Sequence, residues 1–334
     1  MSEPILRVRN LKKYYKSGSM FGKKETVRAV DGVSFELNHG ETLAIGGESG
    51  CGKSTAVKAL IRIVEPTDGE ILLEGEDFRT LSGAKLQAAR RNIKMIFQDP
   101  YSSLNPRMTV RDIIAEPIDI DHAWKTRQER EEIVLNTMQE VGLDPSYADR
   151  YPHEFSGGQR QRIGIARAII QRPKVVICDE PVSALDVSIQ AKIINLLREI
   201  QRKQDISYIF ISHDLGVVEH IANRILVMYL GHVVEEGRTE DIFAHPAHPY
   251  TRLLLNSIPK IGKPTDDESV LLEGDLPSPA NPPHGCVFHT RCPYAEARCS
   301  QDAPGMKTID GIHRCACFLD TSADISHADL AMNS

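Results

Sequence analysis

The chain has 334 residues, enough for one large α/β domain with an appendage or for two modest domains. Hydrophobic residues make up 41% and charged residues 26%, a composition typical of a folded globular protein. The formal net charge of -6 provides no basic field overall, which argues against nucleic acid as the main partner. Apolar runs such as Ile225–Leu230 fall far short of the roughly 18 to 20 residues that span a bilayer, so we expect membrane association only through a partner.

The first hundred residues predict short strands and one helix. Met1–Pro4 has no basic start followed by an apolar run, so we expect no secretory signal and a cytoplasmic chain. Val27–Leu37 alternates apolar and polar residues and Glu41–Gly46 is apolar, whereas Thr55–Val64 has helical periodicity. Residues 12–28 are rich in Lys, Gly and Ser, which predicts an exposed hairpin or loop between two early strands. Further short strands are expected over residues 69–98, ending in Lys94–Gln98.

The pattern becomes helical from Pro100 to about Arg150 and then alternates. The helical stretch has one apolar stripe, formed by Ile133, Val134, Met138 and Val141. Beyond Gly158 the expected order is helix Gln159–Gln171, strand Lys174–Cys178, helix Ile189–Lys203, strand Ser207–Ser212 and helix Leu215–Ile221. Such alternation predicts a mainly parallel sheet covered by helices. After about residue 245, many prolines indicate an irregular extension with one helix at Pro249–Ser257.

A glycine-rich loop lies between the apolar strand and the helix that follows it. Gly47-Glu48-Ser49-Gly50-Cys51-Gly52-Lys53-Ser54 fits the phosphate-binding pattern G-x-x-x-x-G-K-[ST]. In such loops the glycines let backbone N–H groups converge on phosphate oxygens, and the helix N-terminus adds its dipole. Lys53 should reach the β- and γ-phosphates, and Ser54 should supply an oxygen to Mg²⁺. The predicted ATP-binding residues of this region are Gly47, Ser49, Gly50, Cys51, Gly52, Lys53, Ser54 and Thr55.

Two carboxylates end a strand that has the pattern of a buried one. Val175–Cys178 is followed by Asp179 and Glu180, an arrangement that can hold a metal ion and position a water molecule. We predict that Asp179 binds Mg²⁺, directly or through water. Glu180 is the candidate general base, because a carboxylate at that place can accept the proton of the water that attacks the γ-phosphate.

Two further polar residues follow predicted strands. Gln98 lies at a strand end just before the helical insertion, so it can touch the metal or its water and also the mobile helical part. His213 follows strand Ser207–Ser212, where an imidazole can hydrogen-bond the γ-phosphate and respond to its loss.

Phe155-Ser156-Gly157-Gly158-Gln159 resembles the signature sequence that separates ABC ATPases from other phosphate-loop enzymes. That family more often has Leu where this chain has Phe155, an apolar exchange that leaves Ser156 and Gly158 in place. Gln98 resembles the family's glutamine switch, Ser183-Ala184-Leu185-Asp186 its D-loop and His213 its histidine switch. Tyr15 resembles the aromatic residue that stacks on adenine, with Tyr14 as the alternative.

The ABC resemblance implies a fold and a shared active site. The fold is a P-loop NTPase core of the α/β class with a mainly parallel sheet, an antiparallel β subdomain and a helical signature subdomain at about residues 100–160. The signature of one subunit completes the phosphate site of another, so that two composite sites form in a head-to-tail dimer and the monomer is inactive or weak. The residues that this implies are Ser156, Gly157, Gly158 and Gln159 in the signature, acting in trans, and Ser183 and Asp186 in the D-loop.

The C-terminal part resembles a narrower family. His248–Leu254, Leu272–Pro279 and Gly285-Cys286 are similar to the C-terminal extension of oligopeptide and dipeptide importer ATPases. We therefore divide the chain into an ABC ATPase domain at residues 1–245 and an extension at residues 246–334. Related subunits for nickel or other small solutes share the extension, so the resemblance leaves the solute open.

The resemblance implies an ATPase motor on the cytoplasmic face of the membrane. Its partners would be a second, related but non-identical ABC ATPase, two integral membrane permease subunits and an extracytoplasmic solute-binding protein, with no nucleic acid. A soluble ABC ATPase that acts on nucleic acid or ribosomes is the competing class. Such proteins usually carry two cassettes or a long coiled-coil insertion, and this sequence has neither.

Five of the seven cysteines lie between Cys286 and Cys317. In a reducing cytoplasm this clustering favours metal binding over disulfides. Thiolates suit iron–sulfur and zinc equally, so spacing alone leaves the metal open. Some of the importer ATPases that the chain resembles carry a structural [4Fe–4S] cluster here, with Zn²⁺ the alternative. The resemblance implies that the ligands are Cys286, Cys292, Cys299 and Cys317 and that Cys315 is a spare. We expect Cys51 and Cys178 to be unliganded, because one lies in a loop that works through its backbone and the other on a buried strand.

Overall fold

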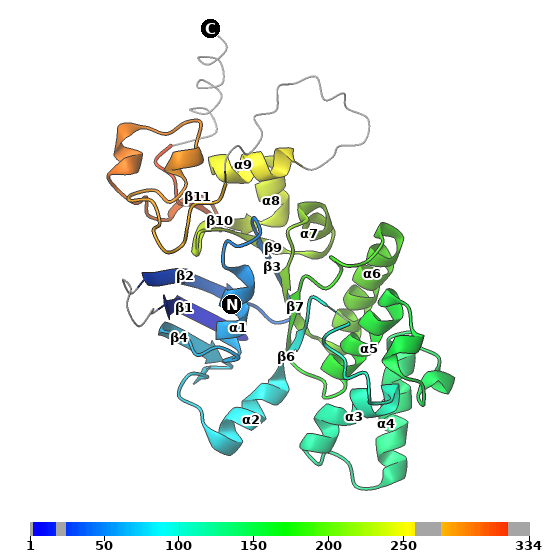
Figure 1. Cartoon of the computed structure of the whole chain (residues 1–334). Coiled ribbons are helices and arrows are strands. Elements are labelled where there is room, and N and C mark those ends of the chain that lie inside the picture. Colours follow the sequence, from blue (N-terminus) through cyan, green and yellow to red (C-terminus); the bar gives the residue numbers. More distant parts are fainter. Residues whose placement is uncertain (1–2, 18–24, 100, 258–274, 320–334) are drawn as a thin grey trace. The chain divides into compact units, whose positions relative to one another are not determined.

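A computed structural model of the chain describes residues 3–17, 25–99, 101–257 and 275–319 (Figure 1). The first part of the predicted motif Leu272–Pro279, residues 272–274, lies outside the described residues, as do Pro100 and residues 18–24 of the segment predicted to be a hairpin or loop. The chain divides into two compact units. Unit 1 comprises Met1–Ile5, Leu37–Thr42 and Leu73–Ile211, and unit 2 comprises Leu6–Glu36, Leu43–Leu72 and Ser212–Ser334.

Unit 1 contains three adjacent parallel strands. They are β8 (Ser207–Ile211), β7 (Val175–Asp179) and β6 (Ile93–Ile96), with Val175 opposite both Ser207 and Ile93. Every residue of β7 and β8 is buried, as expected for central strands of a parallel sheet covered on both faces. Parallel strands end at the same edge of a sheet, so the residues that follow β6 and β7 lie near one another.

The helical part of unit 1 confirms the predicted insertion and adds detail. Its elements are α3 (Val110–Ile120), α4 (Arg127–Glu140), η1 (Pro145–Tyr147), η2 (Pro152–Glu154) and α5 (Gly157–Ile169), followed beyond β7 by α6 (Val187–Gln204). Helix α3 packs on α4 and α5, and α5 packs on α6. Of the predicted stripe, Val134, Met138 and Val141 are fully buried and Ile133 is half-buried. Strand β5 (Glu76–Asp77) and helix α2 (Gly83–Asn92) precede this part, and α2 was not predicted.

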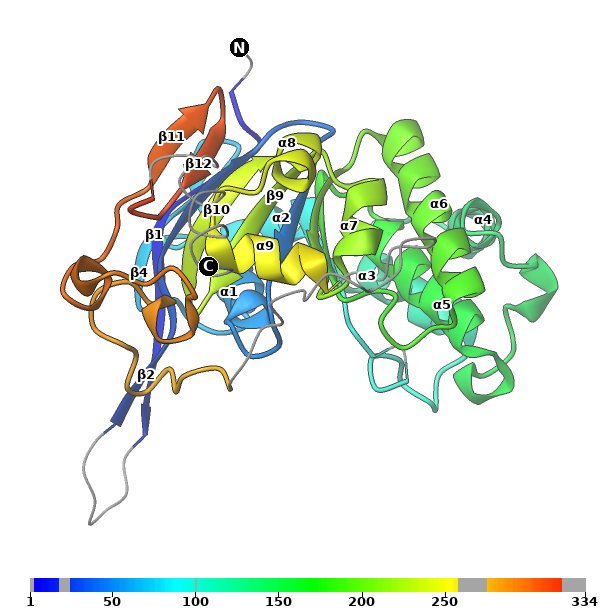
Figure 2. The same cartoon turned by 90° about the horizontal axis from the view of Figure 1, so that it is seen from above.

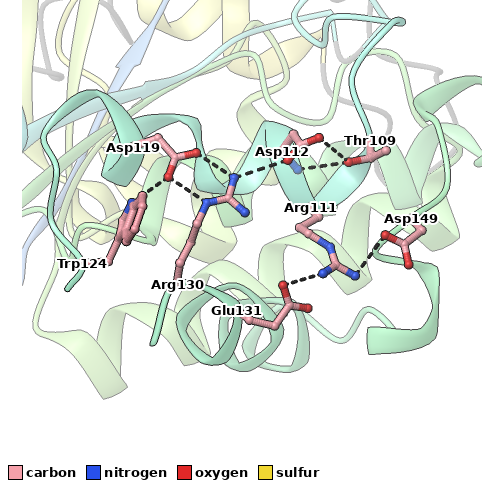
Figure 3. A network of polar contacts seen from close by, with 8 residues as sticks. All are labelled: Thr109, Arg111, Asp112, Asp119, Trp124, Arg130, Glu131 and Asp149. Atoms are coloured by element: carbon pink, nitrogen blue, oxygen red, sulfur yellow. Dashed lines mark hydrogen bonds and ion pairs between the residues drawn. The ribbon is translucent and has the colours of Figure 1, made fainter. Parts of the chain in front are cut away.

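Polar contacts join α3 to α4 (Figure 3). Arg130 of α4 binds both Asp112 and Asp119 of α3, and Trp124 donates to Asp119 at 2.8 Å. Thr109 caps the N-terminus of α3 by accepting from the amide of Asp112. These contacts fix the helices that lead to the signature.

Unit 2 has two sheets. One contains β2 (Glu25–Leu37), β1 (Leu6–Ser17) and β4 (Asp68–Leu73) in that order, and the predicted alternation in β2 appears as alternating burial. The other has the order β11 (Lys307–Asp310), β12 (His313–Cys315), β10 (His232–Arg238), β9 (Arg224–Tyr229) and β3 (Thr42–Gly46). Within the described residues of this second sheet, β3 and β9 are parallel, whereas β9–β10, β10–β12 and β11–β12 are antiparallel pairs. The helical elements are α1 (Lys53–Leu60), α7 (Leu215–Ile221), α8 (Thr239–Ala244), α9 (Pro249–Asn256), η3 (His289–Arg291) and η4 (Ala297–Ser300).

The structure refines one expectation about irregular segments and corrects another. Within the predicted hairpin or loop at residues 12–28, β1 continues to Ser17 and β2 begins at Glu25, and these two strands are neighbours in one sheet. The C-terminal extension forms β11 and β12, which add to the edge of β10, with Cys315 opposite Glu235 (Figure 2). Among the described residues, no helix is both long enough and apolar enough to span a bilayer.

Candidate nucleotide site and cysteine pocket

The phosphate loop connects the buried strand β3 to helix α1 in unit 2. Gly47 has φ 143° and Gly52 has φ 107°, backbone conformations that favour glycine. A Cβ on Gly47 would lie 2.3 Å from the carbonyl oxygen of Met228, and one on Gly52 would lie 2.2 Å from that of Ala29. Both positions therefore require glycine, and the loop is held tightly against the neighbouring backbone.

Lys53 is nearly buried and its ammonium lies over the loop. The Nζ atom donates to the carbonyl oxygens of Gly47 at 2.7 Å and Glu48 at 2.9 Å. Helix α1 has no acidic residue in its first turn and no side-chain cap at Gly52. The N-terminus of this helix, which is its positive end, therefore has a lysine and no acidic side chain in its first turn. This arrangement favours the binding of an anion. Ser54 and Thr55 follow in the first turn, and Cys51 is buried within the loop.

The two tyrosines proposed for adenine stacking have different surroundings. Tyr15 is 41% exposed, with the ammonium of Lys13 4.8 Å from its ring centre. Tyr14 is half-buried and donates to Asp31 at 2.6 Å, and burial together with this bond raises the pKa of Tyr14 to about 12. Tyr14 is thus engaged within the sheet, and Tyr15 has the ring face that a base could reach.

The predicted carboxylates and the glutamine belong to unit 1. Asp179 is the last residue of β7 and is 3% exposed. Glu180 has φ 47°, a left-handed conformation that is uncommon for a residue with a side chain, and its amide donates to Ile211 at 3.1 Å. Gln98, which follows β6, donates through Nε2 to Oε2 of Glu180 at 2.8 Å. Strain held in place by such contacts is typical of functional positions.

His213 lies in the turn after β8 and is exposed. The next residue, Asp214, caps α7 by accepting from the amides of Gly216 and Val217. Ser212, which precedes the histidine, donates to the carbonyl of Asp214 at 3.1 Å. The backbone on both sides of His213 is therefore fixed, while its imidazole remains accessible to solvent.

The signature residues form the start of α5. Ser156 is the N-cap, and its hydroxyl accepts from the amide of Gln159, whose side chain accepts from the amide of Ser156 in return. A Cβ on Gly158 would lie 2.6 Å from Cγ2 of Ile189 in α6, so this glycine allows close packing of the two helices. Phe155 is buried against Tyr147, which explains why an aromatic residue is accepted at that place.

The predicted D-loop connects β7 to α6 in the same unit. Ser183 donates through its hydroxyl to the carbonyl of Glu180 at 3.1 Å, and Asp186 stands at the N-cap of α6. Gln190 holds the turn by donating to the carbonyls of Val182 and Leu185. The D-loop is thus tied directly to the residue predicted to be the base.

Four of the five C-terminal cysteines line one pocket in unit 2. They are Cys286, Cys292, Cys299 and Cys317. The same pocket is lined by Phe288, Phe318 and Leu319, so its wall is largely apolar apart from the sulfurs. Cys315 lies instead on β12, where it is buried. The structure therefore separates the four predicted ligands from the predicted spare.

Burial favours the protonated form of three thiols of this pocket. Burial, with a smaller effect from the other thiols, raises the pKa of Cys292 to about 12, and burial also raises the pKa of Cys286 and of Cys317. A metal that bound here would therefore have to displace protons. Over the described parts of the chain, no group of three or more His, Cys, Asp or Glu side chains is arranged so that it could hold a metal ion. Cys51 and Cys178 lie elsewhere and are both buried.

One contact of the phosphate loop was not predicted. Arg291 of the extension makes a two-pronged ion pair with Glu48, and the hydroxyl of Tyr250 accepts from the amide of Glu48 at 2.8 Å. Glu48 occupies a variable position of the loop pattern, and its partner is 243 residues away in the chain. The sequence contains no local signal that could have paired them.

Comparison with known proteins places these features in a family. A family model described as "ABC transporter" matches residues 30–183, and one described as "Oligopeptide/dipeptide transporter, C-terminal region" matches residues 234–299. The oligopeptide transport ATP-binding protein AppF of Bacillus subtilis is 54% identical over 322 residues, which cover 95% of this chain and 98% of that protein. The di/tripeptide transport ATP-binding protein DppF of Pseudomonas aeruginosa is 48% identical, with 92% of this chain and 95% of that protein covered.

Solved structures agree with this placement. The dimeric post-hydrolysis state of the ATP-binding cassette MJ0796 bound to ADP and Pi matches with a TM-score of 0.63 and 28% identity, covering 70% of this chain and 98% of that one. The cbiO1 protein of Clostridium perfringens, described as part of an ABC transporter complex, matches with a TM-score of 0.62 and 28% identity over 73% of this chain and 92% of that one. Together with the sequence relatives, these matches show that the chain belongs to the ATP-binding proteins of the ABC-type oligopeptide and dipeptide transporter family.

Proposed function

We propose that this chain is the ATP-hydrolysing motor subunit of an importer of oligopeptides or dipeptides. The observation that carries the motor role is the 2.8 Å hydrogen bond from Gln98 to Glu180 at the carboxyl end of β7. This bond fixes a carboxylate that has a strained backbone conformation, which supports a role for Glu180 as the general base. The peptide as solute rests on the named relatives and on the matched C-terminal region.

ATP would be bound by an aromatic residue, by the phosphate loop and, through Mg²⁺, by side-chain oxygens. Tyr15 would stack on the adenine, the amides of residues 47–55 would surround the phosphates, and Lys53 would leave its loop carbonyls for the β- and γ-phosphates. Ser54, Gln98 and the buried Asp179 have the oxygen donors that suit Mg²⁺. Mg²⁺, when bound, would neutralise charge on the phosphate oxygens.

Hydrolysis would use the polar residues that follow the strands. Glu180 would take a proton from a water molecule while the oxygen of that water attacks the γ-phosphorus. The bond between the γ-phosphorus and the oxygen that bridges it to the β-phosphate would break, which releases ADP. His213, exposed on a fixed turn, would donate to the γ-phosphate and lose that bond after hydrolysis. Gln98 would transmit the change to the helical part that follows it.

The signature would act on the ATP of a second subunit. Ser156 and the amides at the start of α5 face solvent or lie near the surface at a helix N-terminus, as a phosphate contact in trans requires. Gly157, Gly158 and Gln159 would complete this contact, and Ser183 and Asp186 would couple the two sites. The matched cassette MJ0796 is described as dimeric, which supports such an arrangement.

The cysteine pocket would hold a structural [4Fe–4S] cluster. The support for this proposal is that one largely apolar pocket is lined by all four of these cysteines, and cysteine thiolates are the ligands that such clusters use. Zn²⁺ is the alternative occupant. In either case the ligands would be Cys286, Cys292, Cys299 and Cys317.

The remaining proposals concern the assembly. The chain would act on the cytoplasmic face of the membrane, bound to two permease subunits, to a related second ATPase and, through the permeases, to an extracytoplasmic binding protein. Residues 1–245 would form the motor and residues 246–334 an extension specific to this importer class. No helix in the described ranges could itself cross the membrane.

Purification of the intact assembly tests the proposal. Mass spectrometry should identify two ATPases, two permeases and a binding protein loaded with a short peptide, and ATP should drive peptide uptake into vesicles. The Lys53→Ala complex should assemble but fail to transport. Copurification with ribosomal or nucleic-acid components instead of permeases would refute the importer role, and a binding protein loaded with nickel would refute the peptide.

A further inference from the structure

Among the described residues of the C-terminal extension, Tyr250 and Arg291 contact the phosphate loop, and these contacts lie within unit 2. The hydroxyl of Tyr250 accepts from the amide of Glu48, and Arg291 binds both carboxylate oxygens of Glu48, at 2.7 and 3.1 Å. Leu276 lies close to the loop as well, since its Cδ2 would be 3.6 Å from a Cβ placed on Gly50. The phosphate-loop pattern assigns no role to the side chain at position 48, and none of these contacts serves the cysteine pocket.

The ion pair between Arg291 and Glu48 is well suited to fix a geometry. The side chain of Arg291 is 6% exposed and that of Glu48 is 28% exposed, so water screens the pair only in part. A planar guanidinium that binds both oxygens of a carboxylate restrains its direction as well as its distance. Burial alone would lower the pKa of Arg291, but the bonds to Glu48 and Tyr229 raise it, so this side chain stays charged.

The residues that hold Glu48 stand on a rigid base. The rings of Tyr229, Tyr250 and Phe288 are fully buried, with centroids 4.8 to 5.3 Å apart in edge or tilted contacts. Such aromatic clusters leave little freedom to the groups attached to them. The hydroxyl of Tyr250 and the guanidinium of Arg291 are therefore presented to the loop from a fixed platform.

Glu48 is itself part of the lysine's environment. Its carbonyl oxygen accepts from Nζ of Lys53, so movement of Glu48 would move an atom that positions the ammonium. Its carboxylate is also a negative charge on a loop that binds a polyphosphate, and an uncompensated charge there would repel the ligand. Arg291 neutralises this charge and, by binding both carboxylate oxygens, restrains the direction of the side chain.

We propose that Arg291, together with Tyr250, is a positioning residue for ATP binding, which neutralises and orients Glu48 so that the phosphate loop can accept a triphosphate. This inference rests on the proposed function of the loop. It makes the extension part of the nucleotide site rather than an independent appendage. By linkage, ATP binding must in turn stabilise the segment that carries Arg291.

The test measures the affinity of the full chain for the Mg²⁺ complex of a non-hydrolysable ATP analogue by calorimetry. Arg291→Gln should weaken binding by about 10-fold, a typical size for coupling between sites, and in the purified complex it should change the kcat of ATP hydrolysis much less than the KM for ATP. Tyr250→Phe keeps the ring and should weaken binding by about 3-fold, because one hydrogen bond to the loop amide is lost. Arg314→Gln is the matched control, since Arg314 also pairs with a glutamate of the same unit, Glu236, at 2.8 Å, and it should leave the affinity unchanged.

A double variant separates positioning from a structural effect. Glu48→Gln combined with Arg291→Gln removes the uncompensated charge, so it should bind the analogue more tightly than Arg291→Gln alone. If the arginine only holds the extension together, the double variant will bind no better than the single one, and the proposal is refuted. Unchanged affinity in both Arg291→Gln and Tyr250→Phe would also refute it.

Two further measurements keep the outcomes distinct. Amide hydrogen exchange in residues 286–292 should slow on addition of the analogue in the parent chain and not in Arg291→Gln; equal slowing in both would refute the coupling. Lys53→Ala, measured in parallel, should lose binding. If Lys53→Ala binds as tightly as the parent, the proposed function of the loop itself is wrong, whereas loss in Lys53→Ala with no loss in Arg291→Gln overturns only the present inference.

Discussion

Glu180→Gln removes the proposed base and leaves its surroundings in place. The side-chain carbonyl of glutamine can still accept the hydrogen bond that Gln98 gives to Glu180 at 2.8 Å. The left-handed backbone at φ 47° is equally strained with either side chain, because both have the same Cβ. We expect a change of only about 1 kcal/mol in the free energy of unfolding, the difference between a charged and a neutral hydrogen bond.

The effect on turnover should be far larger. A general base contributes about 10²- to 10⁴-fold, which corresponds to about 3 to 5 kcal/mol of the activation barrier. The phosphate loop and its lysine remain intact, so the affinity for ATP should stay close to that of the parent. The variant should then accumulate as an ATP-bound dimer.

Single-turnover phosphate release from the purified complex, measured beside ATP binding and thermal unfolding, checks this expectation. Glu199→Gln is a suitable control, because Glu199 is a carboxylate of the same unit that pairs with Lys203 on the exposed side of α6. A Glu180→Gln complex that hydrolyses ATP within about 3-fold of the parent rate would remove Glu180 from its assigned role. If Glu180→Gln instead lost its affinity for ATP, Glu180 would be needed to bind ATP rather than to act as the base.

Three other changes test the partner site, the cysteine pocket and the buried histidine. Ser156→Arg should abolish photo-crosslinking of ATP to the partner ATPase, and Lys53→Ala should abolish it on this chain; loss on this chain alone in Ser156→Arg would mean that the signature acts in cis. Protein purified without oxygen should be brown, with about four irons per chain and absorbance near roughly 400 nm. Cys317→Ser should lose this metal more readily than Cys315→Ser, and stoichiometric zinc without iron would exclude the cluster. Burial lowers the pKa of His248 to about 4, so as the pH falls below about 6.5 this histidine is protonated in the unfolded chain before it is protonated in the folded one. Denaturant titrations should therefore show that the free energy of unfolding decreases by about 3 kcal/mol by pH 4. The His248→Asn variant should depend less on pH over this range.

The parts of the site that depend on neighbouring residues could be predicted from the sequence. The phosphate loop is a run of glycines with a lysine between a strand and a helix, and the structure has β3 and α1 on its two sides. The helix predicted at residues 55–64 runs from Lys53 to Leu60 in the structure. It begins earlier than predicted because the last residues of the loop already belong to its first turn. Helix α7 has the predicted bounds, Leu215–Ile221. In these segments, hydrophobic periodicity and the residue types of the loop were sufficient to predict the secondary structure.

The missed features depend on distant partners. Lys307–Asp310 is largely exposed and has no apolar alternation, and it is a strand only because β12 pairs with it and β10 offers an open edge. The hydrogen bond from Tyr14 to Asp31 joins residues 17 positions apart and likewise has no local signal in the sequence. The bond between Arg291 and Glu48 likewise exists only in the folded chain. Tertiary pairing, rather than local propensity, decides each of these.

The extension and the ATPase core share one interior, which bears on how the chain should be divided. Glu235 of β10 is completely buried, and its carboxylate accepts from the amides of Ala247 and His248 and contacts Nε2 of His313 at 2.7 Å. All three partners lie beyond residue 245. A chain cut at that boundary would leave a buried carboxylate without them, and a buried charge that has lost its partners is strongly destabilising. The loss of regular sequence periodicity near residue 245 therefore does not mark a boundary between two independent hydrophobic cores. We infer that the extension folds together with β10, the strand that carries Glu235.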